Sequence, residues 1–207
     1  SRGLGDVYKR QPYSRFFFED SQRGRQTTIH CFPVVENVHE TGILASSLVP
    51  ARISEDLNRK ARLIATQIAQ GLQLHGMLAI EMFVMPDGQL LVNELAPRPH
   101  NSGHYTQDGT NVCQFEQHLR AICGWPLREP KLHSPTIMLN LLGEHIPALE
   151  SWHIGLPAEA HLHWYGKAEA RPGRKMAHLN LCATSLDEAL EDLERWNLRS
   201  TPKGIYT

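Results

Sequence analysis

The chain has 207 residues, of which 41% are hydrophobic and 21% charged, values typical of a globular protein long enough to bury a core. Its 21 Lys and Arg residues nearly balance its 22 Asp and Glu residues, and the net charge of −1 gives no electrostatic basis for binding nucleic acid or an anionic membrane. No apolar run approaches the length of a membrane span, and the four cysteines form no CxxC pair, so we expect a reduced, cytoplasmic setting.

The first third of the chain predicts three strands followed by a helix. Apolar runs predict strands at Phe16–Glu19, Thr27–Val35 and Ile43–Val49. Ser54 is a suitable N-cap for the helix, whose end is predicted near His75-Gly76. Apolar residues recur at helical spacing between these points: Leu57, Ala61, Ile64, Ala65, Ile68 and Leu72.

A β-hairpin and an irregular loop are predicted next. Asp87-Gly88 lies between the apolar runs Met77–Met85 and Gln89–Leu95, which is a strong hairpin signal. The loop at residues 96–104 contains two prolines and a glycine, which argue against a helix there. An amphipathic helix that stops at Gly124 then follows, marked by Val112, Phe115, Leu119 and Ile122.

The last third predicts three short strands and a final helix. The strands are Thr136–Leu142, Ala160–Tyr165 and His178–Ala183. Ser185 and Glu188 form a capping box that opens a helix running through Trp196. This order of elements indicates an α+β fold.

The most informative local feature is a pair of carboxylates in the hairpin. A two-residue turn predicts the cross-strand pairs Met85 with Leu90, Phe83 with Val92, and Glu81 with Glu94. Cross-strand Cβ atoms lie roughly 5 Å apart, and two charges at that distance repel by roughly 3 kcal/mol at an effective dielectric of about 20. Divalent cations held by the carboxylates would offset this repulsion.

Two other interpretations of the acidic pair remain open. Arg98 or another base could neutralise the acids, or a slipped register could leave them solvated. Asn93 is predicted on the opposite face from Glu81 and Glu94, so a bulge near the strand end is required to bring it to a metal.

The loop Pro97–His104 offers a guanidinium, two imidazoles, an amide and a hydroxyl on a restrained backbone. These groups suit a small oxyanion beside a metal, although a rigid turn whose polar groups cap their neighbours is the alternative. His100 and His104 have the spacing of a helical zinc pair, but the prolines and Gly103 remove the helix that such a pair needs.

A basic turn lies near the end of the chain. Four cations within nine positions could bind a phosphate, and the alternative is a solvated basic hairpin: Lys167, Arg171, Arg174 and Lys175. His161 and His163 alternate on one strand face, as a metal pair or as packed histidines. The sequence contains neither GxxxxGK[ST] nor GxGxxG, so a bound nucleotide would use neither a P-loop nor a Rossmann turn.

Several stretches resemble the carboxyaminoimidazole ribonucleotide synthases, a family of ATP-grasp enzymes. In the hairpin and loop they are Glu81-Met82-Phe83-Val84, Asn93-Glu94-Leu95-Ala96-Pro97-Arg98 and His100-Asn101-Ser102-Gly103-His104. Upstream they are Glu36-Asn37-Val38-His39 and Gly42-Ile43-Leu44, and downstream they are His161-Leu162-His163-Trp164-Tyr165-Gly166-Lys167 and Arg171-Pro172-Gly173-Arg174-Lys175-Met176-Ala177-His178. The acidic pair is shared across ATP-grasp enzymes, whereas the loop together with the two downstream stretches is much more specific.

The resemblance implies an activity in purine biosynthesis. ATP would phosphorylate bicarbonate to carboxyphosphate, which carboxylates the exocyclic amine of aminoimidazole ribonucleotide. Mg²⁺ would be held by Glu81 and Glu94, and ATP would contact Asn93 and Glu94. The catalytic residues implied for the oxyanion step are Arg98, His100, Asn101 and Lys167. The ribonucleotide would be bound by Lys167, Arg171, Arg174 and Lys175.

The resemblance also implies a domain organisation. Residues 12–130 would form the C-terminal part of an ATP-grasp domain, an antiparallel sheet with helices, and residues 131–207 a small β-rich C-terminal domain. Residues 1–11 match nothing in the family and are expected to be a non-native leader. The family's amino-terminal domain and nucleotide lid have no counterpart here, so we expect a partial chain that is inactive alone. A homodimer is one assembly that the resemblance allows, and the sequence does not specify the oligomeric state.

Three rival interpretations remain. The first is another ATP-grasp purine enzyme or carboxylase, which would keep the acidic hairpin without the downstream stretches. The second is a non-catalytic remnant that binds only the ribonucleotide. The third is a histidine-rich metal-binding protein, which predicts zinc affinity that depends on His161 and His163.

Overall fold

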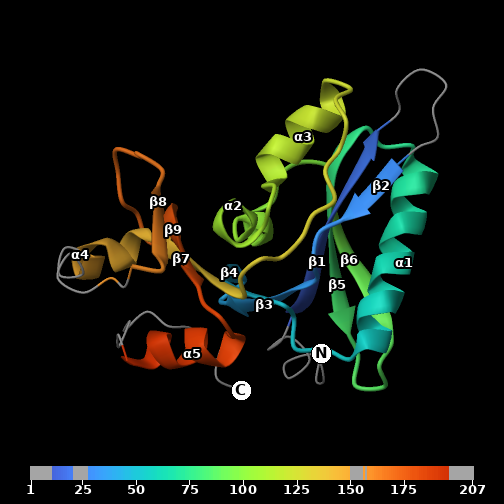
Figure 1. Ribbon diagram of the computed structural model, residues 1–207. Coiled ribbons are helices and arrows are strands. Elements are labelled where there is room, and N and C mark those ends of the chain that lie inside the picture. The colour runs from blue at the N-terminus through green and yellow to red at the C-terminus, as the bar shows by residue number, and fades with distance from the viewer. Residues whose placement is uncertain (1–10, 21–27, 150–155, 157, 196–207) are drawn as a thin grey trace.

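The computed structural model describes residues 11–20, 28–149, 156 and 158–195, and within them one antiparallel sheet organises the fold. The sheet has the order β6-β5-β1-β3-β4-β7-β9-β8, with β2 pairing on β1 (Figure 1). Its strands are β1 (Gln11–Asp20), β2 (Thr28–Cys31), β3 (Val35–Glu40), β4 (Ile43–Val49), β5 (Gly76–Val84), β6 (Leu90–Ala96), β7 (Thr136–Leu142), β8 (Ala160–Trp164) and β9 (Lys175–Cys182). The α+β fold class predicted from the sequence is confirmed.

Helices cover the sheet at both ends. The longer ones are α1 (Glu55–Leu72), α3 (Gln114–Ile122) and α5 (Leu186–Arg195), and the short ones are η2 (Asn101–Gly103), α2 (Thr106–Gly109), η3 (Gly143–His145) and α4 (Ile146–Leu149). In Figure 1, α1 lies beside β5 and β6, while α5 lies beneath β7. No described helix is both long and apolar enough to cross a bilayer.

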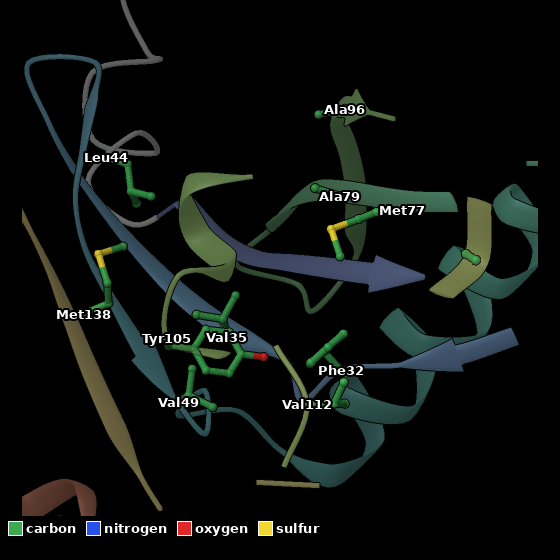
Figure 2. Packing of buried hydrophobic residues seen from close by; sticks show 11 residues of the cluster. Phe32, Val35, Leu44, Val49, Met77, Ala79, Ala96, Tyr105, Val112 and Met138 are labelled. Atoms are coloured by element: carbon green, nitrogen blue, oxygen red, sulfur yellow. The ribbon is translucent and has the colours of Figure 1, made fainter. Parts of the chain in front are cut away.

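Alternating side chains of β5 serve two separate cores. Leu78, Ile80 and Met82 pack with alanines of α1, a cluster that has Ala61, Ala65 and Ala69 on the helix. Met77 and Ala79 point to the other face, into the cluster shown in Figure 2 with Phe32, Val35, Leu44, Val49, Ala96, Tyr105, Val112 and Met138. This period of two is the pattern of a strand buried on both faces. β5 is therefore a rigid support for whatever its carboxyl end carries.

A third core holds the C-terminal strands. It joins β7 and β9 to α5 through a set of apolar residues: Ile137, Leu139, Leu141, Ala177, Leu179, Leu181, Ala189 and Leu193. Because β7 also pairs with β4, the sheet is continuous from residues in the predicted first domain to residues in the second. The domain boundary at 130/131 and the leader remain predictions, and residues 1–10 lie outside the described residues.

Element ends differ from the sequence prediction at several positions: β1 (Gln11–Asp20) is longer than Phe16–Glu19, β9 begins at Lys175 rather than His178, and two further differences have a local cause. The single strand predicted at Thr27–Val35 is two strands, because Pro33 has no N–H for a ladder and its carbonyl instead accepts from the Tyr105 hydroxyl at 2.9 Å. Helix α1 ends near Gln73, which adopts φ 48° and stops the helix before His75-Gly76. Ser54 is confirmed as its N-cap, accepting from the backbone of Leu57.

The C-terminal capping box is only partly as predicted. Ser185 Oγ accepts from the Glu188 backbone N–H at 3.1 Å, which confirms the cap of α5. The Glu188 carboxylate, however, accepts from the backbone and the hydroxyl of Thr184, so the reciprocal bond to Ser185 is replaced. Within the loop predicted as irregular, η2 adds a short turn of helix, and α2 follows directly after that loop.

Two glycine substitutions should have opposite effects on stability. A Cβ at Gly143 would lie 2.1 Å from the Arg171 carbonyl oxygen, whereas one at Gly71 in α1 meets nothing within 4 Å. Gly143→Ala is therefore expected to lower the free energy of unfolding by about 1–3 kcal/mol through overpacking. Gly71→Ala should raise it by up to about 1 kcal/mol, since alanine restricts the unfolded chain. Urea unfolding of both variants measures these changes. Equal changes in the free energy of unfolding would contradict the close packing at Gly143 and the open space at Gly71.

Candidate functional site

The hairpin of β5 and β6 places the two predicted acids opposite each other. Glu81 pairs with Glu94 in the register, as predicted. Beyond that pair the register shifts, so that Met82 pairs with Val92, and the expected pairing of Phe83 with Val92 is wrong. Asn93 is the extra residue of this β-bulge, and the bulge is the feature that an ideal hairpin lacked.

The bulge decides which side chains share the acidic face. The Asn93 side chain hydrogen-bonds Glu81, so it lies with the acids rather than on the opposite face. Phe83 pairs with Leu91, while Leu90 packs against the cluster under α1. The predicted pairs of Met85 with Leu90 and Phe83 with Val92 would place Leu90 and Val92 on the same face as the acids. Leu90 pairs instead with Val84 and Val92 with Met82, so the shift of one residue moves both to the other face.

The carboxylate of Glu81 has a raised pKa, chiefly because it is largely buried and secondly because of the Glu94 charge. The Asn93 hydrogen bond and the Lys175 charge act in the opposite direction. Glu81 is not fully solvated, and no arginine pairs with it among the described residues. The nearby Lys175 charge offsets part of the repulsion, so the interpretation that a base other than Arg98 helps to neutralise the acids stays open. The remaining repulsion from Glu94 is the kind of electrostatic stress that a bound cation relieves.

A pocket of about 570 Å³ opens over this face, and we call it the central pocket. Six residues predicted from the sequence line it: Glu81, Asn93, Glu94, His100, Lys167 and Lys175. They come from β5, β6, the loop before η2, the turn between β8 and β9, and the start of β9. Residues far apart in the chain are thus brought to one site that is strongly polar and carries both signs of charge.

His100 is oriented as a neutral hydrogen-bond donor to the pocket. Burial lowers its pKa to about 4, with the Arg98 and Lys175 charges adding to the effect. Its Nδ1 accepts from the Ser102 backbone N–H at 3.4 Å, so in the neutral ring Nε2 carries the hydrogen. That Nε2 lies 3.9 Å from Glu81 Oε1, at the edge of the acidic pair.

Sequence reasoning missed His39, which lines the same pocket from β3. Burial lowers its pKa to about 4, and its buried Nδ1 has no hydrogen-bond partner among the described residues. His39 belongs to the stretch that resembles an upstream part of the family, but no spacing or local pattern marked it as a site residue. The lining is completed by the turn residue Gly42, by Ile43 and Leu44 at the start of β4, and by Gly173.

The fold separates the four cations of the basic turn between β8 and β9: two line the central pocket and two lie outside it. Lys175 is largely buried, which lowers its pKa, while Glu81 raises it. Arg171 and Arg174 are exposed outside the pocket lining, where Arg171 pairs with Glu169. The turn is anchored because Gly143 donates its N–H to the Arg174 carbonyl at 2.9 Å.

Two loop residues lie just outside the pocket lining. Arg98 is exposed and donates to the Pro99 carbonyl at 3.1 Å. Asn101 has a buried side-chain nitrogen without a hydrogen-bond partner within the described part of the chain. An unsatisfied buried donor of this kind calls for an explanation, and an oxyanion is one that fits its chemistry.

The histidine-rich metal site is not supported. Within the described residues, no group of three or more His, Cys, Asp or Glu side chains is arranged to hold a metal ion. His163 Nε2 instead contacts Asp108 Oδ2 at 2.7 Å, and His161 lies 3.7 Å from the same carboxylate. His104 stacks on other rings rather than facing His100 as a zinc partner.

Acid should destabilise the fold through its buried histidines. Burial lowers the pKa of His104 to about 4 and of His178 to about 2, both below the ordinary 6.5 of an unfolded chain. Stability is therefore complete above pH 6.5 and falls as the pH drops towards these folded values, because only the unfolded chain takes up the protons. After allowance for partial exposure, we expect each ring to cost about 1 kcal/mol or more between pH 7 and pH 5. Urea unfolding at the two pH values tests this, and an unchanged midpoint would contradict it.

Two protein families match separate parts of the chain. Residues 21–115 match the ATP-grasp domain, and residues 136–192 match the phosphoribosylaminoimidazole carboxylase C-terminal domain. The N5-carboxyaminoimidazole ribonucleotide synthase of Bacillus subtilis (strain 168) is 47% identical over 169 residues, which cover 81% of this chain and 44% of that protein. The chain belongs to the carboxyaminoimidazole ribonucleotide synthase family.

Solved structures of carboxyaminoimidazole ribonucleotide synthases agree with the fold. An ADP complex of such a synthetase superposes with a TM-score of 0.85 at 44% identity, over 93% of this chain and 49% of that chain. The enzyme of Aspergillus clavatus, in complex with ADP and 5-aminoimidazole ribonucleotide, gives 0.82 at 32% identity, over 91% and 51%. The chain therefore spans about half the length of the carboxyaminoimidazole ribonucleotide synthases that it matches.

Proposed function

We propose that the central pocket is the metal, oxyanion and ribonucleotide part of an enzyme that carboxylates aminoimidazole ribonucleotide with bicarbonate and ATP. The observation that carries the proposal is the meeting of Glu81, Asn93 and Glu94 with Lys167 and Lys175 in one pocket. In the proposed reaction, a bicarbonate oxygen attacks the γ-phosphorus and ADP leaves, which yields carboxyphosphate. The exocyclic amine then attacks the carboxyl carbon, phosphate leaves, and the amine loses a proton.

Magnesium fits the acidic pair. Glu81 and Glu94 supply carboxylate oxygens, the ligands that Mg²⁺ prefers, and their mutual repulsion favours a cation between them. When bound, Mg²⁺ would neutralise charge on the transferring phosphoryl group. Asn93, moved to this face by the bulge, can donate from its amide to a nucleotide phosphate.

The loop residues are proposed to bind bicarbonate and carboxyphosphate. Neutral His100 presents an Nε2–H to the pocket, and Asn101 has a buried amide nitrogen without a partner in the described structure. Arg98 lies close enough for its charge to lower the pKa of His100. Donors held in place before the reaction stabilise charge that develops in a transition state.

The ribonucleotide is proposed to lie along the basic turn. Lys167 and Lys175 face the pocket from that turn, and charge-assisted hydrogen bonds to phosphate are among the strongest available to a protein. Arg171 and Arg174 are exposed and would contact the ribonucleotide only at its outer end. The Aspergillus clavatus relative has been solved with ADP and this ribonucleotide together, which supports the assignment of substrate.

A chimera tests the proposal. In it, residues 28–195 of this chain replace the matching part of the Bacillus subtilis relative. We expect ADP release that requires both bicarbonate and aminoimidazole ribonucleotide, with carbon from labelled bicarbonate appearing in the ribonucleotide product. A folded chimera that releases ADP without carboxylating the ribonucleotide would contradict the proposal. The homodimer, and the cytoplasmic location expected from the cysteines and the lack of a long apolar run, remain predictions.

A further inference from the structure

Three histidine rings form a continuous stack beside the central pocket. His104 and His178 have ring centroids 4.4 Å apart with planes inclined by 16°, and His178 and His163 are 4.4 Å apart at 11°. His104 follows η2, whereas His178 and His163 lie on β9 and β8. The stack therefore joins the loop that carries His100 to the strands that carry the basic turn.

Hydrogen bonds fix both ends of the stack. His163 is held through Nε2 by Asp108 at 2.7 Å and through Nδ1 by Gln107 at 3.3 Å. At the other end, His104 Nδ1 lies 3.0 Å from the Gln114 amide nitrogen. Asn180 ties the two ends together, because its amide donates to Asp108 at 2.6 Å and to the His104 carbonyl at 3.0 Å.

The middle ring of the stack, His178, fixes the position of the Tyr165 side chain. The Tyr165 hydroxyl hydrogen-bonds His178 Nδ1 at 2.8 Å. Burial keeps His178 neutral, and burial also raises the pKa of Tyr165 to about 12, so neither group carries a charge at neutral pH. A neutral pair can stack and hydrogen-bond without the repulsion that adjacent imidazolium rings would introduce.

Tyr165 in turn orients Lys167. The Lys167 Nζ lies over the Tyr165 ring, 5.3 Å from its centroid, and also donates to the Lys175 carbonyl. An ammonium group over an aromatic face is attracted by the ring quadrupole. One of these two contacts depends on Tyr165, which the stack fixes, and the other depends on the β9 backbone. Together they hold the ammonium at the pocket lining.

We propose that Tyr165 and His178 are positioning residues that hold Lys167 in the central pocket, and that the stack transmits the position of the loop before His104 to this lysine. The catalytic consequence rests on the proposed function of Lys167. The geometric part does not, since it concerns only how the ammonium is held.

The geometric part is tested on this chain with Tyr165→Phe, which keeps the ring beneath Lys167 and removes only the bond to His178. The readout is the rate at which an amine-reactive reagent modifies Lys167, followed by mass spectrometry with exposed Lys60 as the internal reference. We expect the rate to rise about threefold to tenfold, the range that corresponds to loss of one hydrogen bond. Tyr105→Phe is the matched control, because it removes another tyrosine hydrogen bond, to the Pro33 carbonyl, away from Lys167. An unchanged rate in Tyr165→Phe, or the same rise in both variants, overturns the proposal.

The catalytic part is tested in the chimera with a double-mutant cycle. Tyr165→Phe should lower kcat/KM for aminoimidazole ribonucleotide while leaving the Kd for ATP unchanged. In a Lys167→Met background the same substitution should have no further effect, because it acts through Lys167. Additive losses overturn the claim that Tyr165 is a positioning residue for this lysine. If the chimera does not carboxylate at all, the proposed function fails, and the labelling rate alone decides whether Tyr165 holds the ammonium.

Discussion

Glu94→Gln is expected to abolish ATP turnover by the chimera while leaving its fold intact. The substitution removes one of the two charges that would hold Mg²⁺ opposite Glu81. Metal stabilisation of a transferring phosphoryl group amounts to several kcal/mol, so the expected loss in kcat is about 100-fold or more. Steady-state ADP release at saturating Mg²⁺ measures it. Glu191→Gln is the matched control, an exposed glutamate on α5 outside the central pocket, and it should leave turnover unchanged.

The same variant makes a second, independent prediction for this chain without metal. Because the Glu94 charge helps to raise the pKa of Glu81, its removal should lower that pKa and relieve the repulsion across the hairpin. Thermal unfolding in a chelator should then show a Tm at or slightly above that of the unsubstituted chain. Normal turnover, or a marked fall in the metal-free Tm, would contradict the assignment of the acidic pair.

Lys175→Met is expected to raise the KM for aminoimidazole ribonucleotide by about 10-fold to 100-fold, the loss of one charge-assisted hydrogen bond to a phosphate. We expect this effect because Lys175 lines the central pocket. The Kd for ATP should change little if the lysine contacts the ribonucleotide. Lys131→Met, an exposed lysine outside the pocket, is the control.

The two arginines of the basic turn should matter less than Lys175. Arg171 is exposed and already paired with Glu169, so Arg171→Ala removes a solvent-screened charge. Arg174→Ala should likewise raise the KM for the ribonucleotide only a few-fold and spare ATP. A larger effect of either arginine substitution than of Lys175→Met would contradict the claim that Lys175 binds the ribonucleotide in the pocket while the arginines lie outside it. A fall in ATP affinity in all three variants would contradict the assignment of this turn to the ribonucleotide.

The sequence predicted the hairpin well because its signal is local. Asp87-Gly88 and the flanking apolar runs specify the turn, and Glu81 does pair with Glu94. The bulge at Asn93 could not be predicted, since it depends on how an edge strand of the sheet meets the residues around it rather than on its own alternation. That one irregularity determines which side chains join the acids.

The other site residues and contacts that the sequence did not predict depend on segments that are distant in the chain. His39 comes from β3 and lies near His100 and Lys175 only after the sheet has formed. No spacing in the sequence therefore indicates that His39 lines the pocket. His161 and His163 alternate as predicted, but their partner is Asp108 from α2 rather than a metal. The four cations of the basic turn lie within nine positions of the sequence, yet of these four only Lys167 and Lys175 line the pocket.

The transfer of oxygen from bicarbonate to phosphate tests the central claim most directly. Bicarbonate labelled with ¹⁸O is supplied to the chimera with ATP, Mg²⁺ and aminoimidazole ribonucleotide, and the phosphate released is examined by mass spectrometry. If the central pocket forms carboxyphosphate, each phosphate carries one oxygen from bicarbonate, and the carboxylated ribonucleotide carries the other two. Phosphate without the label, formed at the same rate as ADP, would show that water rather than bicarbonate attacks ATP and would contradict the account.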